Sequence, residues 1–365
     1  MRAPGASKVL GHAFALVRPI LHRLDPEQAH HLILRTLRLG FARSAPEPDD
    51  PILTTRVFGL DFANPVGLAA GFDKDAEVMD AMLSFGFGFV EAGTVTPRQQ
   101  PGNPKPRLFR LDEDKAVINR FGFNSAGLAA FKERLRRRRS RGSAGIVGAN
   151  VGKNRDTVDA AADYERGIEE LTPFADYLVV NISSPNTPGL RSLQQRKEIE
   201  ALLGRALAAR GRAARGDRPP PLMAKVGPDL SDEEVSDIAE AALASGVDGL
   251  IVGNTTVERP VGLKSSHRTE MGGLSGRPLK MRADECLTSM YRHAGGRVPI
   301  VGCGGIESGD DAYAKIRAGA SLVQLYSALV FEGPGLVSRV KRELAARLRA
   351  DGFASLGNAV GVDHR

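Results

Sequence analysis

Short apolar runs alternate with longer polar stretches over most of the chain, beginning near Asn64. Uninterrupted apolar runs of this length are typical of strands that are buried on both faces of a parallel sheet. Because the spacers suit helices, eight such runs predict an α/β fold, a (β/α)8 TIM barrel, rather than an open doubly wound sheet. The runs cover residues 65–71, 89–95, 146–152, 177–183, 222–227, 249–255, 299–305 and 322–328.

A pair of helices is predicted ahead of the barrel. Asp25 is a typical N-cap with Pro26 at the first helical position, and the second helix is expected to end at Gly40. The pair either packs on the core as ordinary helices or forms a hairpin that places its apolar faces in a membrane surface. The first helix carries one apolar stripe, formed by Leu10, Phe14, Val17, Leu21 and Leu24.

These patterns divide the chain into three parts. A helical segment covers residues 1–44 and the barrel covers residues 45–345, with a linker rich in Pro and Asp at 44–51 between them. Residues 346–365 form a C-terminal tail, of which 351–365 is expected to be a flexible end.

Composition and charge narrow the class of protein. The apolar fraction of 42% and the charged fraction of 25% are those of a globular protein. A net charge of +7 indicates an anionic partner, which is a nucleic acid, an anionic lipid or an acidic small molecule. Two cysteines are too few for a disulfide framework or a cysteine-built metal site, so we expect a reducing compartment and no metal.

Two basic stretches contribute much of the positive charge. Residues 132–141 and the stretch before Leu222 contain no interleaved aromatic residues that would stack on bases. A solvated helix end and loop is therefore favoured over nucleic-acid binding. No apolar run reaches the roughly 18 residues of a spanning helix, and the first twenty residues lack the compact apolar centre of a signal peptide.

Several catalytic motifs are incomplete. The stretch "GANVGKN" at 148–154 has too short a spacing for a Walker loop, and no serine lies in a nucleophile elbow. The glycines of "GCGG" at 302–305 follow a late strand instead of the first one. In barrels, the loops after strands seven and eight often bind phosphate, so these glycines, with Tyr326 and Ser327, predict a phosphate-bearing cofactor.

Two lysines lie at predicted strand ends. Lys74 follows "LAAGFD", and Lys225 lies within the apolar "MAKVG". A buried lysine needs an anionic partner, because an unpaired buried charge is costly. That partner is a carboxylate of the protein, an anionic cofactor ring or the substrate.

Eight short motifs occur together and in order along the chain. They are "AAGFDK", "EAGTVTP", "NRFGFN", "NISSPNTPGLR", "GNTT", "GGLSGRPL", "GCGGI" and "LYSAL". This ordered set resembles dihydroorotate dehydrogenase, and specifically its quinone-dependent, membrane-associated class 2. The resemblance runs from the N-terminal helices to about Gly333.

The resemblance implies an enzyme that holds FMN and oxidises dihydroorotate to orotate in pyrimidine biosynthesis. Ser184 matches the catalytic base, where class 1 relatives have a cysteine; a site environment, a water chain or Thr187 must activate it. The implied FMN contacts are Ala70, Gly71, Thr94, Asn150, Asn181, Lys225, Gly253, Gly276, Gly305, Tyr326 and Ser327. The implied substrate contacts are Lys74, Asn119, Arg120, Phe121, Gly122, Phe123, Asn124, Asn181, Asn186, Asn254 and Thr255.

The resemblance also implies a second substrate. In class 2 the N-terminal helices form an apolar tunnel for a membrane quinone, and His30 and Arg107 match positions that contact it. The protein is then expected on the cytoplasmic face of a bacterial inner membrane, bound to the lipid surface, with no nucleic acid and no obligate protein partner.

This chain departs from the family at one position near the flavin. Gly253 stands where a threonine is frequent in the family, which removes one hydroxyl near the flavin.

Two other readings remain. A transfer-RNA dihydrouridine synthase is also a basic FMN barrel, but it needs a cysteine acid near the flavin and an RNA-binding domain. Cys303 lies in the expected phosphate loop and Cys286 in a predicted helix. A non-catalytic membrane adaptor would bind no flavin.

Overall fold

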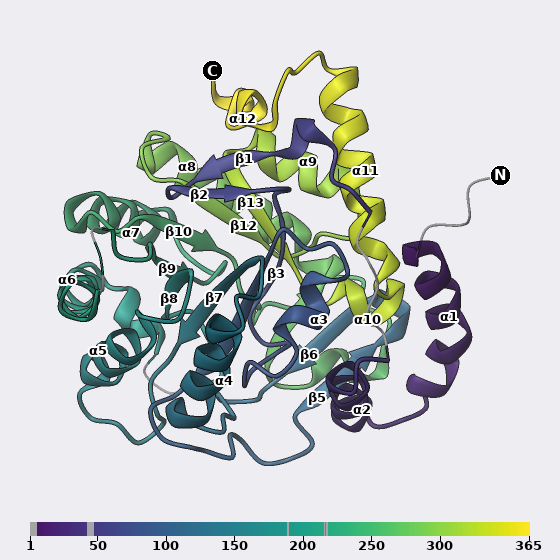
Figure 1. Cartoon of the computed structure of the whole chain (residues 1–365), viewed down its shortest axis with the longest axis horizontal. Coiled ribbons are helices and arrows are strands. Elements are labelled where there is room, and N and C mark those ends of the chain that lie inside the picture. The colour runs from purple at the N-terminus through teal and green to yellow at the C-terminus, as the bar shows by residue number, and fades with distance from the viewer. Residues whose placement is uncertain (1–5, 42–46, 188–189, 215, 217) are drawn as a thin grey trace.

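The structure is a computed structural model that describes residues 6–41, 47–187, 190–214, 216 and 218–365, without the side chains of 6–13, 191 and 192. Its centre is a closed barrel of eight parallel strands (Figure 1). All eight predicted runs contribute a strand, so the predicted TIM barrel is confirmed. In barrel order the strands are β3 (Val66–Leu68), β4 (Phe89–Val95), β7 (Ile146–Val151), β8 (Tyr177–Asn181), β9 (Leu222–Val226), β10 (Gly249–Val252), β12 (Ile300–Cys303) and β13 (Ala320–Leu325).

Helices cover the outside of the barrel. Each buries an apolar stripe against the strands, as Ile238 of α7 and Leu287 of α8 do. Helix α7 begins at a capping box between Ser231 and Glu234, and α9 begins after its cap Ser308. The covering helices are α3 (Met79–Leu83), α4 (Leu128–Ser140), α5 (Ala160–Leu171), α6 (Arg196–Ala213), α7 (Asp232–Ser245), α8 (Lys280–Ala294), α9 (Gly309–Arg317) and α11 (Gly335–Ala350).

A small antiparallel hairpin closes the amino-terminal end of the barrel. Strands β1 (Thr55–Val57) and β2 (Leu60–Phe62) are joined by Phe58 and Gly59, both at positive φ. The apolar side chains of the hairpin pack against the barrel interior, including Phe89 and Tyr177. These side chains fill this end of the barrel, and the carboxyl ends of the strands are the end at which barrels of this kind bind ligands. The sequence did not predict the hairpin.

A second small sheet lies over the mouth of the barrel, and it was not predicted either. Strands β5 (Leu108–Leu111), β6 (Ala116–Asn119) and β11 (Gly273–Gly276) pair antiparallel in the order β11-β6-β5. One face packs its own core. The other face turns toward the mouth and carries Leu108, Arg110, Val117, Asn119 and Ser275.

The two N-terminal helices are present at one side of the barrel mouth (Figure 1). Helix α1 (Ala6–Leu21) contacts α10 (Ala328–Glu332) and α11, and α2 (Pro26–Arg38) contacts β5. The predicted cap is confirmed, because Asp25 accepts hydrogen bonds from the backbone N–H groups of Glu27 and Gln28 at 3.0 Å. Leu24 of the predicted stripe lies beyond the end of α1, and the Leu10 side chain and residues 44–46 of the linker are outside the described part.

The C-terminal segment is packed on the barrel, so the expectation of a flexible end is wrong. Helix α12 (Leu356–Ala359) buries Leu356 and Ala359, and Asp363 forms an ion pair with Arg317 of α9 at 2.5 Å. The expected boundary between residues 345 and 346 falls inside α11. Short 3-10 turns cover Pro51–Leu53, Asp112–Asp114, Arg191–Gln194, Ser266–Thr269, Arg277–Leu279 and Val362–His364.

Candidate active site

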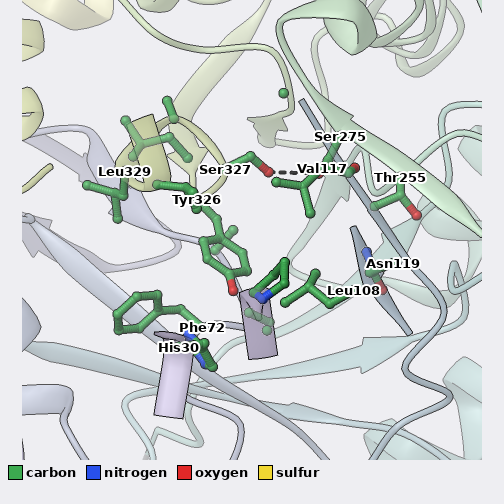
Figure 2. A pocket seen from close by; sticks show the side chains of 18 of the residues that line it. His30, Phe72, Leu108, Val117, Asn119, Thr255, Ser275, Tyr326, Ser327 and Leu329 are labelled. Carbon is green, nitrogen blue, oxygen red and sulfur yellow. Dashed lines mark hydrogen bonds between the residues drawn. The ribbon is translucent and has the colours of Figure 1, made fainter. Parts of the chain in front are cut away.

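A cavity of about 690 Å³ opens at the carboxyl ends of the barrel strands. Its walls come from the strand ends, from the face of the β11-β6-β5 sheet that turns toward the mouth, and from α1 and α2. Figure 2 shows aromatic residues gathered on one side and polar residues on the other. This volume lies in the range of small-molecule sites.

Most of the residues expected at the site line this one cavity, although they are far apart in the sequence. They are Ser184, His30, Lys74, Asn119, Phe121, Gly122, Phe123, Asn181, Asn186, Asn254, Thr255, Ala70, Gly71, Thr94, Lys225, Gly276, Gly305, Tyr326 and Ser327.

Five expected residues do not line the cavity. Asn124 and Asn150 lie directly behind its wall, where they hold Lys74 and Asn181. Arg120 turns away to the Glu270 carboxylate at 2.9 Å. At Gly253 an added Cβ would lie 2.0 Å from the Cys303 carbonyl oxygen, so this glycine permits close strand packing. Arg107 is the fifth residue that does not line the cavity, and its side chain instead binds Glu27.

A buried polar network forms the floor of the cavity. The Asn181 side chain donates from Nδ2 to Thr94 Oγ1 at 2.9 Å and to Asn150 Oδ1 at 3.1 Å. Thr94 in turn donates to Asn150 Oδ1 at 2.6 Å. Since these residues come from three adjacent strands, the barrel itself fixes their positions.

Lys225 lies in this floor with a protein carboxylate as its partner. Its Nζ is 3.6 Å from Glu91 Oε1, and both side chains are buried. Burial alone would lower the pKa of Lys225, but the Glu91 carboxylate overcomes that effect and raises the pKa above its ordinary value. Of the three kinds of partner that the sequence left open, a carboxylate of the protein is thus present.

Lys74 is another lysine that lines the cavity. Its Nζ donates to Asn124 Oδ1 at 3.0 Å and lies 3.3 Å from the centre of the Phe121 ring. Burial, with the positive charge of Arg107 as a second cause, lowers the pKa of Lys74 to about 7. Since an anion beside it would reverse that shift, this ammonium is suited to bind a carboxylate of a ligand.

The loop after β8 treats its two adjacent serines differently. Ser183 is held on both sides, because it donates to Asn181 Oδ1 at 2.8 Å and accepts from Asn254 Nδ2 at 2.6 Å. Ser184 Oγ accepts only a 3.3 Å bond from the Asn186 backbone N–H among the bonds between described residues. Nearby, the buried Thr187 hydroxyl has no hydrogen-bond partner in the described part. Pro188 and Gly189 of this loop lie outside it.

An aromatic cluster forms the side of the cavity next to α2. The His30 ring meets the edge of Phe72 with ring centres 5.2 Å apart, and Tyr326 lies 5.6 Å from Phe72 (Figure 2). Burial, followed by the charges of Lys74 and His31, lowers the pKa of His30 to about 3. His30 is therefore neutral at physiological pH and suits an uncharged ligand.

Two arginines near this side have different roles. Arg107 donates to both oxygens of Glu27, at 3.1 and 2.7 Å, and to two backbone carbonyls, so it fastens α2 to the barrel. Arg110, two strand positions after Leu108, lines the cavity and donates to the His22 carbonyl oxygen at 2.5 Å. The sequence reading did not find Arg110. The two-residue spacing of strand β5 is the signal that identifies it.

Glycine-rich backbone forms the remaining wall. Gly276 and Gly305 both have positive φ, and an added Cβ at either position would lie 2.4 Å from neighbouring backbone atoms. Next to them, Ser327 donates to Ser275 Oγ at 2.8 Å (Figure 2). Open backbone N–H groups and hydroxyls of this kind are suited to bind phosphate.

Comparisons with known proteins agree with this geometry. Residues 52–348 match the family model for dihydroorotate dehydrogenase. The dihydroorotate dehydrogenase (quinone) of Xanthobacter autotrophicus is 62% identical over 358 residues, which cover 96% of this chain and 99% of that protein. The mitochondrial dihydroorotate dehydrogenase (quinone) of Mus musculus is 53% identical over 353 residues, which cover 95% and 89%.

Solved structures agree as well. The crystal structure of DHODH from Eimeria tenella in complex with ferulenol has a TM-score of 0.90 and 46% sequence identity, and the match covers 93% of this chain and 96% of that one. The family model and these identities extend over the barrel and its site. The chain belongs to the dihydroorotate dehydrogenase family.

Proposed function

We propose that this protein oxidises (S)-dihydroorotate to orotate with bound FMN and passes the electrons to a membrane quinone, a step of de novo pyrimidine biosynthesis. The observation that carries the proposal is a single cavity with two chemically different sides. One side presents Lys74, Ser184 and several asparagines, and the other presents neutral His30 among aromatic and aliphatic side chains. A polar, anionic substrate and an apolar acceptor therefore fit the same cavity.

The residues present fit FMN. Glycine backbone at Gly276 and Gly305 suits the phosphate, and Thr94, Asn181 and Lys225 offer polar groups for the ring system. The buried Gln324 Oε1 lines the cavity and has no hydrogen-bond partner among the described residues, so it can accept from an N–H of the ligand. When bound, FMN supplies a two-electron acceptor for the hydride from substrate.

In this proposal, the side of the cavity that carries Lys74, Ser184 and the asparagines binds the substrate and removes its proton. The Lys74 ammonium pairs with the dihydroorotate carboxylate, and side chains such as Asn119 and Asn254 match the alternating N–H and C=O groups of the ring. Ser184 removes the proton from C5 as the hydride leaves C6. It is the loop serine whose hydroxyl is not already committed to a side-chain network. Thr187 is the nearby hydroxyl that can relay the proton.

The apolar side receives the quinone. Arg110 is the cation at this wall, and we propose it as the residue that binds the quinone head, together with His30, in place of Arg107. The Arg107 guanidinium is occupied by Glu27 and by backbone carbonyls. The walls of the passage are apolar residues of α1 and α2, among them Leu21, Ala29 and Ile33.

The same helices suit a lipid surface. None of the described helices is both long and apolar enough to cross a membrane. Helix α1 nevertheless exposes Leu16 and Ile20, the turn after α2 exposes Leu39 and Phe41, and the net charge is +7. We propose peripheral attachment to an anionic bilayer, at the cytoplasmic face of a bacterial inner membrane.

The choice of acceptor tests this proposal. Orotate formation is measured with a membrane quinone and, separately, with NAD⁺ as the acceptor. We expect turnover with the quinone and none above background with NAD⁺, because the passage is lined mainly by apolar side chains, which suit a quinone better than a charged dinucleotide. Faster turnover with NAD⁺ would contradict the assignment.

A further inference from the structure

The Glu91 side chain lies inside the barrel with none of its surface exposed. Its Oε1 accepts from Asn150 Nδ2 at 2.7 Å and lies 3.6 Å from Lys225 Nζ. Its Oε2 accepts from Gln324 Nε2 at 2.7 Å and from the Tyr177 hydroxyl at 3.4 Å. All four neighbours are donors, so the group they surround is a carboxylate and not a carboxylic acid.

This carboxylate is the end of a hydrogen-bond chain that reaches the cavity. Asn254 donates to Ser183, Ser183 donates to Asn181, Asn181 donates to Asn150, and Asn150 donates to Glu91. Every bond in the chain points toward Glu91. Asn150 must turn its Nδ2 toward the Glu91 carboxylate, and its Oδ1 is then the atom that accepts from Asn181. Each later residue of the chain is oriented in the same way, so Glu91 fixes which polar atoms face each other along the chain.

The same carboxylate balances a charge. Lys225 is the cation of the cavity floor, and Glu91 is the acidic group with which it forms an ion pair among the described residues. Removing one partner of a buried ion pair leaves an uncompensated charge in a medium of low dielectric constant. The net charge of the floor therefore depends on Glu91 as much as on Lys225.

We propose that Glu91 is a positioning residue that sets the charge and the hydrogen-bond direction of the cavity floor, and through them the reduction potential of the bound flavin. The inference rests on the proposed function, because FMN is its reporter. Positive charge near a flavin stabilises the anionic reduced form, so a floor with net charge +1 raises the potential and a neutral floor does not.

The test is the midpoint potential of the FMN in the wild type and in Glu91→Gln, measured by dye-linked titration from about pH 6 to about pH 9, on either side of neutrality. Near pH 6, where Lys225 keeps its proton, we expect the variant to have the higher potential. A tenfold change in the two-electron equilibrium corresponds to about 30 mV, and we expect at least that difference. The wild type keeps this proton because Glu91 raises the pKa of Lys225, whereas in the variant burial acts without that carboxylate and lowers the pKa, so the difference should shrink as the pH rises.

Two control variants separate charge from packing. Tyr177→Phe removes a weaker donor to the same carboxylate without changing charge, and its potential should follow the wild type. Glu91→Gln with Lys225→Met removes both charges, and the pH-dependent difference should disappear. A Glu91→Gln potential that equals the wild type, or that differs by the same amount at every pH, would overturn the inference.

Lys225→Met provides an independent test if Glu91→Gln does not fold. Lys225→Met leaves Glu91 without its cation, so the potential should be lower than that of the wild type; a higher potential would overturn the inference. The titration needs bound flavin but no turnover. A wild-type protein that contains FMN but is not reduced by dihydroorotate would contradict the proposed substrate alone, and one without flavin would contradict both proposals.

Discussion

Asn254 donates a hydrogen bond to Ser183 at 2.6 Å and leaves the next residue, Ser184, outside the side-chain network of the cavity floor. Two adjacent hydroxyls thus have different environments, one fixed within the network and one available to a ligand. This difference provides a matched pair of variants for identifying the catalytic base.

Ser184→Ala should keep FMN and lose turnover by about 10²- to 10⁴-fold, the usual contribution of a positioned acid or base. Ser183→Ala removes two hydrogen bonds worth about 1 kcal/mol each, so its turnover should fall by less than about 30-fold. Steady-state rates at saturating dihydroorotate and quinone measure both effects. Equal losses in the two variants would remove Ser184 as the base.

Substrate binding should depend on the protonation of Lys74. Its pKa is lowered to about 7 in the free protein, and only the ammonium form attracts the carboxylate of the ligand. A bound carboxylate raises that pKa, so orotate binds most tightly below about pH 7 and more weakly as the pH rises above it, by up to about tenfold per pH unit.

The dissociation constant of orotate, read from the flavin spectrum across this range, checks the dependence. Lys74→Met should bind weakly at every pH, and the slope above neutrality should be lost. A dissociation constant that does not change with pH in the wild type would contradict the role of Lys74.

Arg110→Met should impair the reaction with quinone, whereas Arg107→Met should mainly lower the stability of the protein. Loss of the Arg110 charge should raise the KM for quinone by about tenfold or more, while the rate of flavin reduction by dihydroorotate stays the same. Loss of Arg107 leaves the buried Glu27 carboxylate with two exposed neighbours, Lys105 and His31, and should cost up to about 3 kcal/mol of stability. Stopped-flow reduction, quinone kinetics and denaturant unfolding distinguish them; a quinone defect confined to Arg107→Met would reverse the assignment.

Membrane attachment should depend on the exposed apolar side chains of α1 and of the turn that follows α2. Leu16 and Phe41 are each 79% exposed. Changing both to Ser should weaken binding to anionic vesicles by about tenfold or more, since each buried apolar side chain contributes about 1.5–3 kcal/mol. Val158→Ser, at a fully exposed position before α5, is the control and should bind as the wild type does. Equal binding of all three proteins in a vesicle sedimentation assay would exclude this surface.

The sequence predicted the barrel well, because strands buried on both faces appear as uninterrupted apolar runs. It missed the elements whose pattern is short or mixed. The strands of the β11-β6-β5 sheet have four residues each, and the turn of the closing hairpin is Phe58-Gly59 in place of the usual Asn-Gly. The C-terminal end has little periodicity, and tertiary contacts such as the Arg317–Asp363 ion pair hold it in place.

The same reasons explain which residues of the site could be predicted from the sequence and which could not. Strand-end residues such as Lys225 and Asn181 were found because the fold brings all strand ends together. Glu91 was not identified as the partner of Lys225, because pairing across barrel strands cannot be read from a single strand. Arg110 was missed because its strand was missed. Arg120 was expected at the substrate, but the pairing with Glu270 turns it away from the cavity.

The most direct test of the central claim is an anaerobic visible spectrum of the purified protein before and after addition of dihydroorotate, followed by a membrane quinone. We predict a yellow protein that bleaches with dihydroorotate and regains its colour with quinone, because both substrates reach one flavin from the two sides of the cavity. A protein that stays yellow with dihydroorotate, or that bleaches and is not reoxidised by quinone, would contradict the account.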